Sequence, residues 1–364
     1  MTKIAIFLAD LGGGGAERVM INLANGFIAC GLSVDLVLVY KEGPYLQQLA
    51  PEIKVIELSA SKLITSVFGL ADYLQQSQPE VLLTALEDTN IVAICASWLA
   101  KVKTRVYVTV HNNLSQESLN ATNLKRKYVP RIIRWFYPHC DRVIAVSQGV
   151  ADDLGNFGIA PEQIKVIYNP IFQPDLPQKA AEPIDFPWLE ASNSPVILGV
   201  GRLEAQKDFL TLVKAFAQVK TQVPARLLIL GEGSQKQELM DLASSLGLSE
   251  ADITFPGFVD NPFAYMQRAS VLAMSSTWEG FGNVLVEAMG LGTSVVATDC
   301  PSGPAEILAA GEYGQLVPVK DPQAMANAIF KTLQNPLASD ILRQRAEEFS
   351  LAKSVAAYCQ VMNI

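Results

Sequence analysis

The sequence is poor in the two residue types that most often hold metals. Among its 364 residues it has only two histidines, His111 and His139, so a histidine-based metal centre is not expected. The five cysteines are scattered, with no Cys-x-x-Cys pair, which is typical of reduced thiols and of neither a disulfide framework nor a zinc site. Because the chain also has no Asp-x-Asp pair for a divalent ion, we predict a protein without a metal.

The sequence also lacks a long apolar run and an excess of positive charge. Its first apolar stretch, residues 4–9, is followed by Asp10 and is too short for a signal peptide, so it is predicted as a strand. We therefore expect a cytoplasmic protein. The net charge is -8 and the isoelectric point is near 5.0, which argues against nucleic acid as a partner.

Apolar runs of strand length alternate with helical patterns from end to end, which is typical of parallel sheets wound with helices. Half of the residues are apolar and 18% are charged, as expected for sheets covered on both faces. A chain of 364 residues is longer than a domain with a single hydrophobic core usually is, so two domains are expected. We predict an α/β fold of two doubly wound, Rossmann-like domains facing each other across a cleft. The runs are residues 4–9, 33–40, 54–58, 81–84, 105–110, 142–146, 164–167, 196–200, 226–230, 253–255, 271–274, 294–298 and 315–317.

The alternation pauses once, between residues 170 and 195, where six prolines occur and no periodic apolar segment does. This pause predicts an N-terminal domain at 1–170, a linker at 171–195, a C-terminal domain at 196–337 and a final helix at 338–364. Ligands of such sheets bind beyond the carboxyl ends of the strands. Chemistry is therefore expected in the loops that follow the strands.

The loop and helix at 275–292 carry two acids on an otherwise apolar segment. Glu279 lies in the turn, and Glu287 lies on a helix that is apolar nearly all round, where an unpaired charge would be costly. The amides of Phe281, Gly282 and Asn283 open this helix, and the start of a helix favours a phosphate. Two hydroxyl acceptors beside an anion site are a reasonable nucleotide-sugar pocket.

Three other loops of the second half follow strands. In GVGRLEAQKD, the guanidinium of Arg202 and the ammonium of Lys207 would neutralise a diphosphate leaving group. Gly231, in LILGEGSQ, allows close backbone contact with a ligand. In GFVD, Gly257 is followed by Phe258, which could face a base.

The first half has a glycine run, LGGGGAER, directly after its first strand, and it includes Gly14 and Gly15. A dinucleotide fold would use such a loop, but it also needs an acid at the end of the second strand, where this chain has Val39 and Tyr40. His111 follows another strand. A lone histidine is more often a packed or capping residue than a catalyst, but its place at the end of a strand in the predicted cleft favours a catalytic role enough to keep both interpretations open.

Residues 124–142 are the only strongly basic stretch, with six Lys and Arg against one Asp, and Trp135, Phe136 and Tyr137 lie among the charges. Cations mixed with aromatic residues are typical of a surface that contacts an anionic membrane or a lipid-linked phosphate. The alternative is a solvated helix whose aromatic side chains pack inward.

Taken together, five motifs resemble those of the GT-B glycosyltransferases of family 4, the retaining nucleotide-sugar enzymes. The resemblance covers essentially the whole chain, and it implies that the N-terminal domain takes the acceptor, the C-terminal domain takes the donor and the segment 338–364 crosses back to the first domain. The motifs are GGGGAERV near the start, GRLEAQKD, LILGEGSQ, EGFGNVLVE with its Glu-x7-Glu spacing, and CPSGPAEIL.

The resemblance implies a role for each marked position. Arg202 and Lys207 hold the diphosphate, Glu279 contacts donor-sugar hydroxyls and Glu287 contacts the ribose hydroxyls. The other donor contacts are the amides of Phe281, Gly282 and Asn283, the backbone at Gly231, Gly257 and Phe258 beside the base, and Gly14 and Gly15 from the N-terminal domain. His111 lies near the transferring sugar. The candidate catalytic residues are His111, Arg202, Lys207 and Glu279.

The predicted function is retaining, metal-independent transfer of a hexose or N-acetylhexosamine from a nucleoside diphosphate sugar, UDP-linked, to a hydroxyl acceptor. We expect an acceptor from lipid-linked or envelope polysaccharide assembly, such as a lipid-linked oligosaccharide, no cofactor besides the donor, and contact with the inner membrane face through residues 124–142. The alternatives are a non-catalytic nucleotide-sugar-binding protein of the same fold and an NAD-dependent oxidoreductase. The sequence leaves the oligomeric state open.

Overall fold

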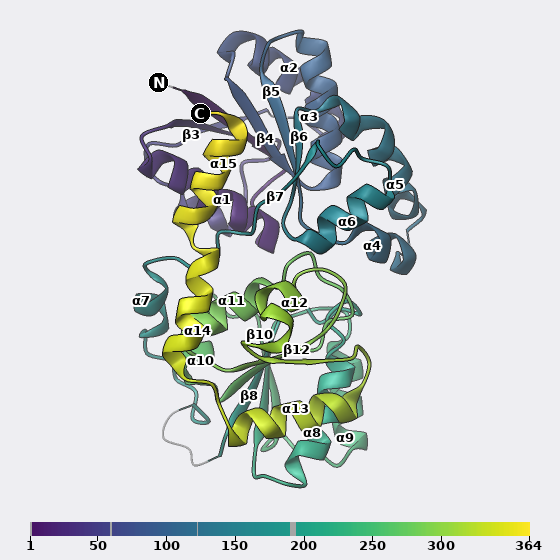
Figure 1. Ribbon diagram of the computed structural model, residues 1–364, viewed down its shortest axis with the longest axis vertical. Helices are drawn as coiled ribbons and strands as arrows, with labels where there is room; N and C mark the ends of the chain where they lie inside the picture. The colour runs from purple at the N-terminus through teal and green to yellow at the C-terminus, as the bar shows by residue number, and fades with distance from the viewer. Residues whose placement is uncertain (1, 59, 122, 190–193) are drawn as a thin grey trace. The chain divides into compact units, whose positions relative to one another are not determined.

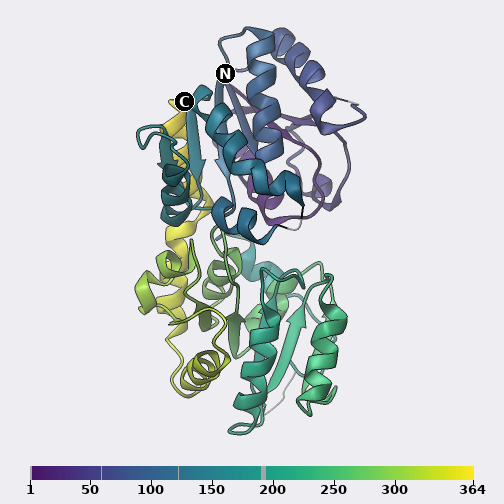
Figure 2. The ribbon, with the colours of Figure 1, turned by 90° about the vertical axis from the view of Figure 1, so that its right-hand side faces the viewer.

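The computed structural model describes residues 2–58, 60–121, 123–189 and 194–364. Contacts divide the chain into two compact units, the first comprising Met1–Pro170 and Leu351–Ile364 and the second comprising Ile171–Ser350. Each unit is a parallel sheet with helices on both faces (Figures 1 and 2). The predicted fold class, two doubly wound α/β domains, is confirmed.

The sheet of the first unit has seven parallel strands in the order β3-β2-β1-β4-β5-β6-β7. Its central strands are apolar and buried on both faces, as parallel sheets covered by helices require. The strands are β1 (Lys3–Leu8), β2 (Ser33–Leu38), β3 (Lys54–Glu57), β4 (Val81–Ala85), β5 (Arg105–Val110), β6 (Arg142–Ala145) and β7 (Ile164–Val166).

From β1 the chain continues toward one edge of the sheet, and from β4 it continues toward the other edge. Because crossovers between parallel strands are right-handed, these two directions place the helices on opposite faces. Helix α1 packs with α15, and α2 packs with α3 (Figure 1). The helices are α1 (Gly15–Ala29), α2 (Ser66–Ser77), α3 (Glu87–Ala100), α4 (Leu114–Asn120), α5 (Leu124–Phe136), α6 (Gln148–Asn156) and α15 (Leu351–Met362), with 3-10 turns η1 (Pro44–Gln48), η2 (Leu63–Thr65) and η3 (Tyr137–His139).

The sheet of the second unit has six parallel strands in the order β10-β9-β8-β11-β12-β13. Strands β8 and β11 are neighbours, and the chain leaves them toward opposite edges of the sheet. Their carboxyl ends therefore form the crevice in which open α/β sheets bind ligands. The strands are β8 (Val196–Val200), β9 (Arg226–Leu230), β10 (Ile253–Gly257), β11 (Val271–Met274), β12 (Val295–Thr298) and β13 (Gln315–Val317).

One face of this second sheet is buried by α8, α9 and α13, whose apolar side chains share a core with β8, β9 and β12. The other face is covered by α10 and α11, and α14 packs on α11. The helices are α7 (Leu176–Ala180), α8 (Phe209–Lys220), α9 (Lys236–Ser245), α10 (Pro262–Arg268), α11 (Asn283–Gly290), α12 (Pro304–Ile307), α13 (Pro322–Gln334) and α14 (Ser339–Ala346), with 3-10 turns η4 (Ala309–Gly311) and η5 (Glu347–Phe349).

The segment 338–364 was expected to be one helix, and it is two, α14 in the second unit and α15 in the first. The break follows from Phe349, whose ring is buried and meets the ring of Phe281 edge-on. The carbonyl of Phe349 accepts hydrogen bonds from the amides of Ile171 and Phe172, so the backbone cannot continue as a helix there. Beyond the break, α15 packs on α1, and Phe27 meets Tyr358 edge-on at 6.3 Å.

The predicted linker at 171–195 is a packed part of the second unit rather than a free connection. Leu176 is buried on α7, Asn261 donates to the carbonyl of Lys179 at 2.7 Å, and Arg268 donates to the carbonyl of Ala180 at 2.9 Å. The prolines prevent a long periodic element but leave short segments that pack on α10. Residues 190–193 of the prediction lie outside the described residues.

Candidate active site

Loops from β8 and β11 meet at the carboxyl edge of the second sheet. Ser275 donates to the carbonyl of Lys207 at 2.8 Å, the amide of Thr277 donates to the carbonyl of Gln206 at 2.8 Å, and Gln206 donates in return to the carbonyl of Trp278 at 3.0 Å. These bonds join two loops, about seventy positions apart along the chain, at the crevice between the carboxyl ends of β8 and β11.

An ion pair connects the same two loops. Nζ of Lys207 is 2.5 Å from Oε1 of Glu279, and the side chains are 19% and 8% exposed. Ser276 donates to the same carboxylate oxygen at 2.6 Å. A charge with so little solvent needs paired and hydrogen-bonded surroundings. The pair therefore presents a fixed cation beside a fixed acceptor at the mouth of the sheet.

The other predicted residues of the second unit are split between exposed and buried positions. Arg202 is exposed directly beyond β8, and Phe258 is 65% exposed directly beyond β10. Glu287 is only 3% exposed on α11, among the apolar side chains that the sequence indicated. The structure thus places Arg202 and Phe258 where a ligand can reach them, and it buries Glu287 one helical turn after Asn283, the first residue of α11.

Two glycines are required by backbone geometry at this edge. A Cβ on Gly231 would lie 2.0 Å from the carbonyl oxygen of Gly201, so the loops after β8 and β9 approach as closely as only glycine permits. Gly282 precedes α11 with φ of 104°, and the amide of Leu285 donates to its carbonyl at 3.0 Å. Helix α11 itself begins at Asn283, so Phe281 and Gly282 form the turn before it.

In the first unit, the predicted residues lie at the carboxyl edge as well. Gly14 precedes α1 and Gly15 is its first residue, directly beyond β1. His111 follows β5, and burial lowers the pKa of its imidazole to about 4. The ring is therefore neutral at physiological pH. A neutral imidazole can accept or donate a proton but holds no charge against a phosphate.

The tautomer of His111 follows from its neighbour. The hydroxyl of Thr109 donates its one hydrogen to the carbonyl of Thr84 at 2.9 Å, and Nε2 of His111 lies 2.9 Å from the same hydroxyl oxygen. With that hydrogen used on Thr84, Nε2 is the nitrogen that carries the imidazole hydrogen and donates it to Thr109. Nδ1 is left as the acceptor.

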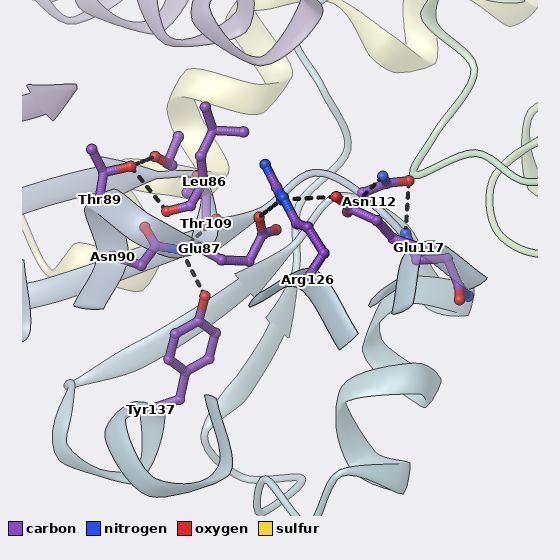
Figure 3. A network of polar contacts seen from close by, with 11 residues as sticks. Leu86, Glu87, Thr89, Asn90, Thr109, Asn112, Glu117, Arg126 and Tyr137 are labelled. Atoms are coloured by element: carbon purple, nitrogen blue, oxygen red, sulfur yellow. Dashed lines mark hydrogen bonds and ion pairs between the residues drawn. The ribbon is translucent and has the colours of Figure 1, made fainter. Parts of the chain in front are cut away.

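A polar network around Glu87 was missed by the sequence interpretation. Glu87 is 4% exposed at the start of α3, and Nη1 of Arg126 lies 3.3 Å from its Oε2 and 2.8 Å from Oε1 of Glu117 (Figure 3). An acid in the first turn of a helix is ordinary, so its residue type alone gave no signal. Its place directly beyond the buried strand β4 was the signal available.

The basic segment divides into an exposed and a buried part. Trp135 is 77% exposed and Tyr128 is 50% exposed, whereas Tyr137 is fully buried and Phe136 stacks on Trp98 with ring centroids 5.8 Å apart. A groove between α4, α5 and α6 is lined by Lys127, Arg131 and Arg134 among others. The side chains of residues 124 and 125 lie outside the described part of the chain.

The described residues hold neither a cluster of metal ligands nor a helix able to span a membrane. Among the described residues, no three His, Cys, Asp or Glu side chains gather as ligands of a metal would. Within the same residues, no helix combines the length and the apolar character needed to cross a bilayer.

This fold and this site define the class of GT-B glycosyltransferases, which agrees with the solved structures that resemble the chain. Residues 13–172 match Glycosyltransferase Family 4, and residues 181–349 match Glycosyl transferases group 1. The chain belongs to glycosyltransferase family 4. Membership confirms the resemblance read from the motifs and removes the oxidoreductase alternative.

Curated relatives resemble the chain over nearly its whole length. The N-acetylgalactosamine-N,N'-diacetylbacillosaminyl-diphospho-undecaprenol 4-alpha-N-acetylgalactosaminyltransferase of Campylobacter jejuni is 32% identical, over 94% of this chain and 92% of its own. Among solved structures, HepE of Anabaena with UDP and glucose superimposes with a TM-score of 0.82 at 22% identity, with full coverage of both chains. Its complex with UDP-glucose gives 0.76 at 25% identity, covering 99% of this chain and 95% of HepE.

Proposed function

We propose that this glycosyltransferase moves a hexose or N-acetylhexosamine from a UDP-sugar to a hydroxyl of a lipid-linked or envelope saccharide, with retention and without a metal. The observation that carries the proposal is the Lys207–Glu279 pair at the carboxyl edge of the second sheet, with Arg202 exposed in the loop after β8 that also carries Lys207. The HepE complex with UDP-glucose supports the donor. The Campylobacter relative, which is named for a diphospho-undecaprenol acceptor, supports the acceptor class.

In this proposal the second unit binds the donor. Arg202 and Lys207 contact the diphosphate, together with the backbone of Phe281, Gly282 and Asn283 at the start of α11, where the helix dipole favours an anion. Glu279 accepts hydrogen bonds from hydroxyls of the sugar, and Glu287 from those of the ribose. The contacts with the base are Gly257 and Phe258, beside Gly231. From the first unit, Gly14 and Gly15 approach the donor, and His111 lies near the sugar.

The chemistry follows from where charge develops. The bond between C1 of the sugar and the phosphate oxygen breaks while a bond from C1 to the acceptor oxygen forms, and the acceptor's proton passes to the departing phosphate. Arg202 and Lys207 stabilise the negative charge of the nucleoside diphosphate as it leaves. Retention follows when the acceptor attacks on the face from which the phosphate departs. A neutral His111 adds no repulsion to an oxocarbenium-like sugar.

Metal independence is tested with a chelator. Because two side-chain cations supply the charge that a divalent ion would bring, kcat/KM should stay within about twofold in excess EDTA. Transfer that falls in EDTA and returns with Mg²⁺ or Mn²⁺ would show that a metal takes part. In the same reactions, proton NMR of the first product formed should show the anomeric configuration of the donor. The opposite anomer would contradict retention.

Membrane contact is proposed for the exposed face of α5. At roughly 1 kcal/mol per cation near an anionic leaflet, replacing Lys127, Arg131 and Arg134 with glutamine should lower partition onto anionic vesicles by about a hundredfold. The measurement is co-sedimentation with vesicles of phosphatidylglycerol and phosphatidylcholine at fixed salt.

A matched control removes the same charge elsewhere. Lys214, Lys236 and Lys331 are exposed on helices of the second unit, and glutamine at these three positions should leave partition unchanged. Equal losses of partition in the two triple variants would show that only net charge matters. Unchanged partition in both variants would contradict membrane contact through α5.

A further inference from the structure

Glu87 lies at the switch point of the first sheet. Strands β1 and β4 are neighbours, and the chain leaves β1 toward β2 and β4 toward β5, on opposite sides. In open α/β sheets the crevice at this point binds ligands. Glu87 is the second residue after β4, and the glycine loop follows β1, so Glu87 lies at this crevice. In the proposed function, this unit binds the acceptor.

The position of Glu87 is costly to the fold. Leu86, directly before it, has φ of 74°, a left-handed conformation that a leucine rarely adopts. Burial, with repulsion from Glu117 as the second cause, raises the pKa of Glu87 to about 7. An environment that disfavours a charge, next to a strained backbone, is what functional sites impose and what packing alone does not need.

Arg126 connects this carboxylate to a second one. Its Nη1 contacts Glu87 at 3.3 Å and Glu117 at 2.8 Å, and Figure 3 shows the guanidinium reaching between them. The side chain is 45% exposed, and within the described residues the hydrogen bonds of its guanidinium all come from Nη1. As far as the described part of the chain goes, two N–H groups on Nη2 and one on Nε can donate to a ligand.

The charge of the cluster selects the kind of ligand. Two carboxylates share one guanidinium, so the group as a whole does not attract a phosphate, and it offers donors and acceptors side by side. Such a mixture suits the hydroxyl groups of a neutral sugar, each of which donates one hydrogen and accepts others. The cationic groove of Lys127, Arg131 and Arg134 differs in this respect.

We propose that Arg126 and Glu117 form a subsite for a neutral sugar of the acceptor, and that Glu87 is the positioning residue that fixes the guanidinium. The subsite rests on the proposed transfer to a saccharide acceptor. Nδ2 of Asn112 donates to Oε2 of Glu117 at 2.9 Å, so the subsite is joined directly to the loop that carries His111. A sugar held by Arg126 and Glu117 would therefore be oriented by the loop whose His111 the proposed function assigns to the transferring sugar.

The test begins with binding of a neutral probe. Octyl glycosides of hexoses and N-acetylhexosamines, added to the full chain, should give saturation-transfer NMR signals on their ring protons. Arg126→Gln should weaken that binding by about tenfold or more, because it removes the charge-assisted donors. Arg126→Lys should recover only part of it, since an ammonium lacks the planar fork. Glycoside binding equal to wild type in both variants would overturn the subsite.

Positioning by Glu87, which follows β4, is tested against a matched control that precedes the same strand. Glu87→Gln should raise the KM of the acceptor by about three- to tenfold and leave the KM of the donor unchanged, as expected for one weakened ionic hydrogen bond. Glu80 is exposed at the opposite end of β4, and Glu80→Gln should change neither constant. A donor KM that rises as much as the acceptor KM would show a general disturbance and contradict the proposal.

Stability and pH separate positioning from a purely structural role. The charges of Glu117, Arg126 and Asp88 shift the pKa of Glu87, and the charge of Glu87 in turn raises the pKa of Tyr137. The folded pKa is above the unfolded one, so stability from this group is full at low pH and is lost as pH rises toward 7. Glu87→Gln should therefore melt higher than wild type at pH 8 and alike at about pH 4, below the unfolded pKa, while binding the acceptor worse. A lower melting temperature at pH 8 with unchanged acceptor KM would show a structural carboxylate only.

The outcomes distinguish this subsite from the function on which it rests. Wild-type protein that binds glycosides through Arg126 but transfers no sugar would contradict the function and keep the subsite. Transfer by wild type with an acceptor KM that is insensitive to Arg126→Gln would keep the function and overturn the subsite. Inorganic pyrophosphate that binds through Arg126 in place of the glycosides would show an anion site and would also overturn it.

Discussion

Lys207→Ala should lower kcat by roughly a hundred- to a thousandfold, the effect of removing one preorganised group that stabilises charge in the transition state. In the structure, Lys207 is fixed by Glu279 at 2.5 Å and by the hydrogen bond of its carbonyl with Ser275, so its position is set before the donor binds. The measurement is the single-turnover rate of nucleoside diphosphate release at saturating donor.

The variant also leaves Glu279 buried without its cation, and removing one member of a buried pair costs about 3–5 kcal/mol. The double variant Lys207→Ala with Glu279→Gln removes the uncompensated charge, so it should recover most of the melting temperature and none of the rate. Lys214→Ala, an exposed change on α8, is the control. Activity that returns together with stability in the double variant would show that Lys207 acts through folding alone.

Glu287→Gln should raise the KM of the donor by about ten- to a hundredfold, the effect of losing hydrogen bonds to a charged acceptor worth roughly 1.5–3 kcal/mol. Glu287 is 3% exposed on α11, and ribose hydroxyls are its proposed ligand. Glutamine keeps the shape and one acceptor oxygen, so the fold should survive.

Nucleotides without ribose hydroxyls make this second prediction specific. Wild type should bind 2',3'-dideoxy-UDP far more weakly than UDP, and Glu287→Gln should discriminate between the two much less, because the charged acceptor is replaced by a neutral amide with one acceptor oxygen. Glu250→Gln, at an exposed position of the same unit, should discriminate as wild type does. A Glu287→Gln protein that still prefers UDP by the full factor would place the ribose elsewhere.

Most of the fold was predictable because periodicity is a property of sequence. Alternating apolar runs and helical stretches indicated two parallel sheets, and the structure has them. The break inside 338–364 was not predictable, since it depends on the carbonyl of Phe349 pairing with Ile171 and Phe172, nearly 180 positions earlier. The packed segment at 171–189 escaped for the same reason, because its contacts with α10 are distant in sequence.

The candidate site, like the fold, has a part that the sequence could predict and a part that it could not. Lys207 and Glu279 were each recognisable from their loops, but their direct ion pair across 72 positions was not, because it depends on which strands become neighbours. Glu87 was missed because an acid at a helix start is common, and only its burial and its contact with Arg126 make it unusual. Residue type and local pattern indicate which loops carry chemistry, and tertiary contacts decide which side chains act together.

Release of nucleoside diphosphate from a panel of nucleotide sugars is the most direct test of the central claim. The pure protein is incubated with each UDP-, GDP- and ADP-linked hexose and N-acetylhexosamine, with and without an octyl glycoside acceptor, and products are read by mass spectrometry. We predict UDP release from at least one UDP-sugar, stimulated by acceptor and lost in Lys207→Ala. No release from any donor, or release that Lys207→Ala leaves intact, would contradict the proposed donor site.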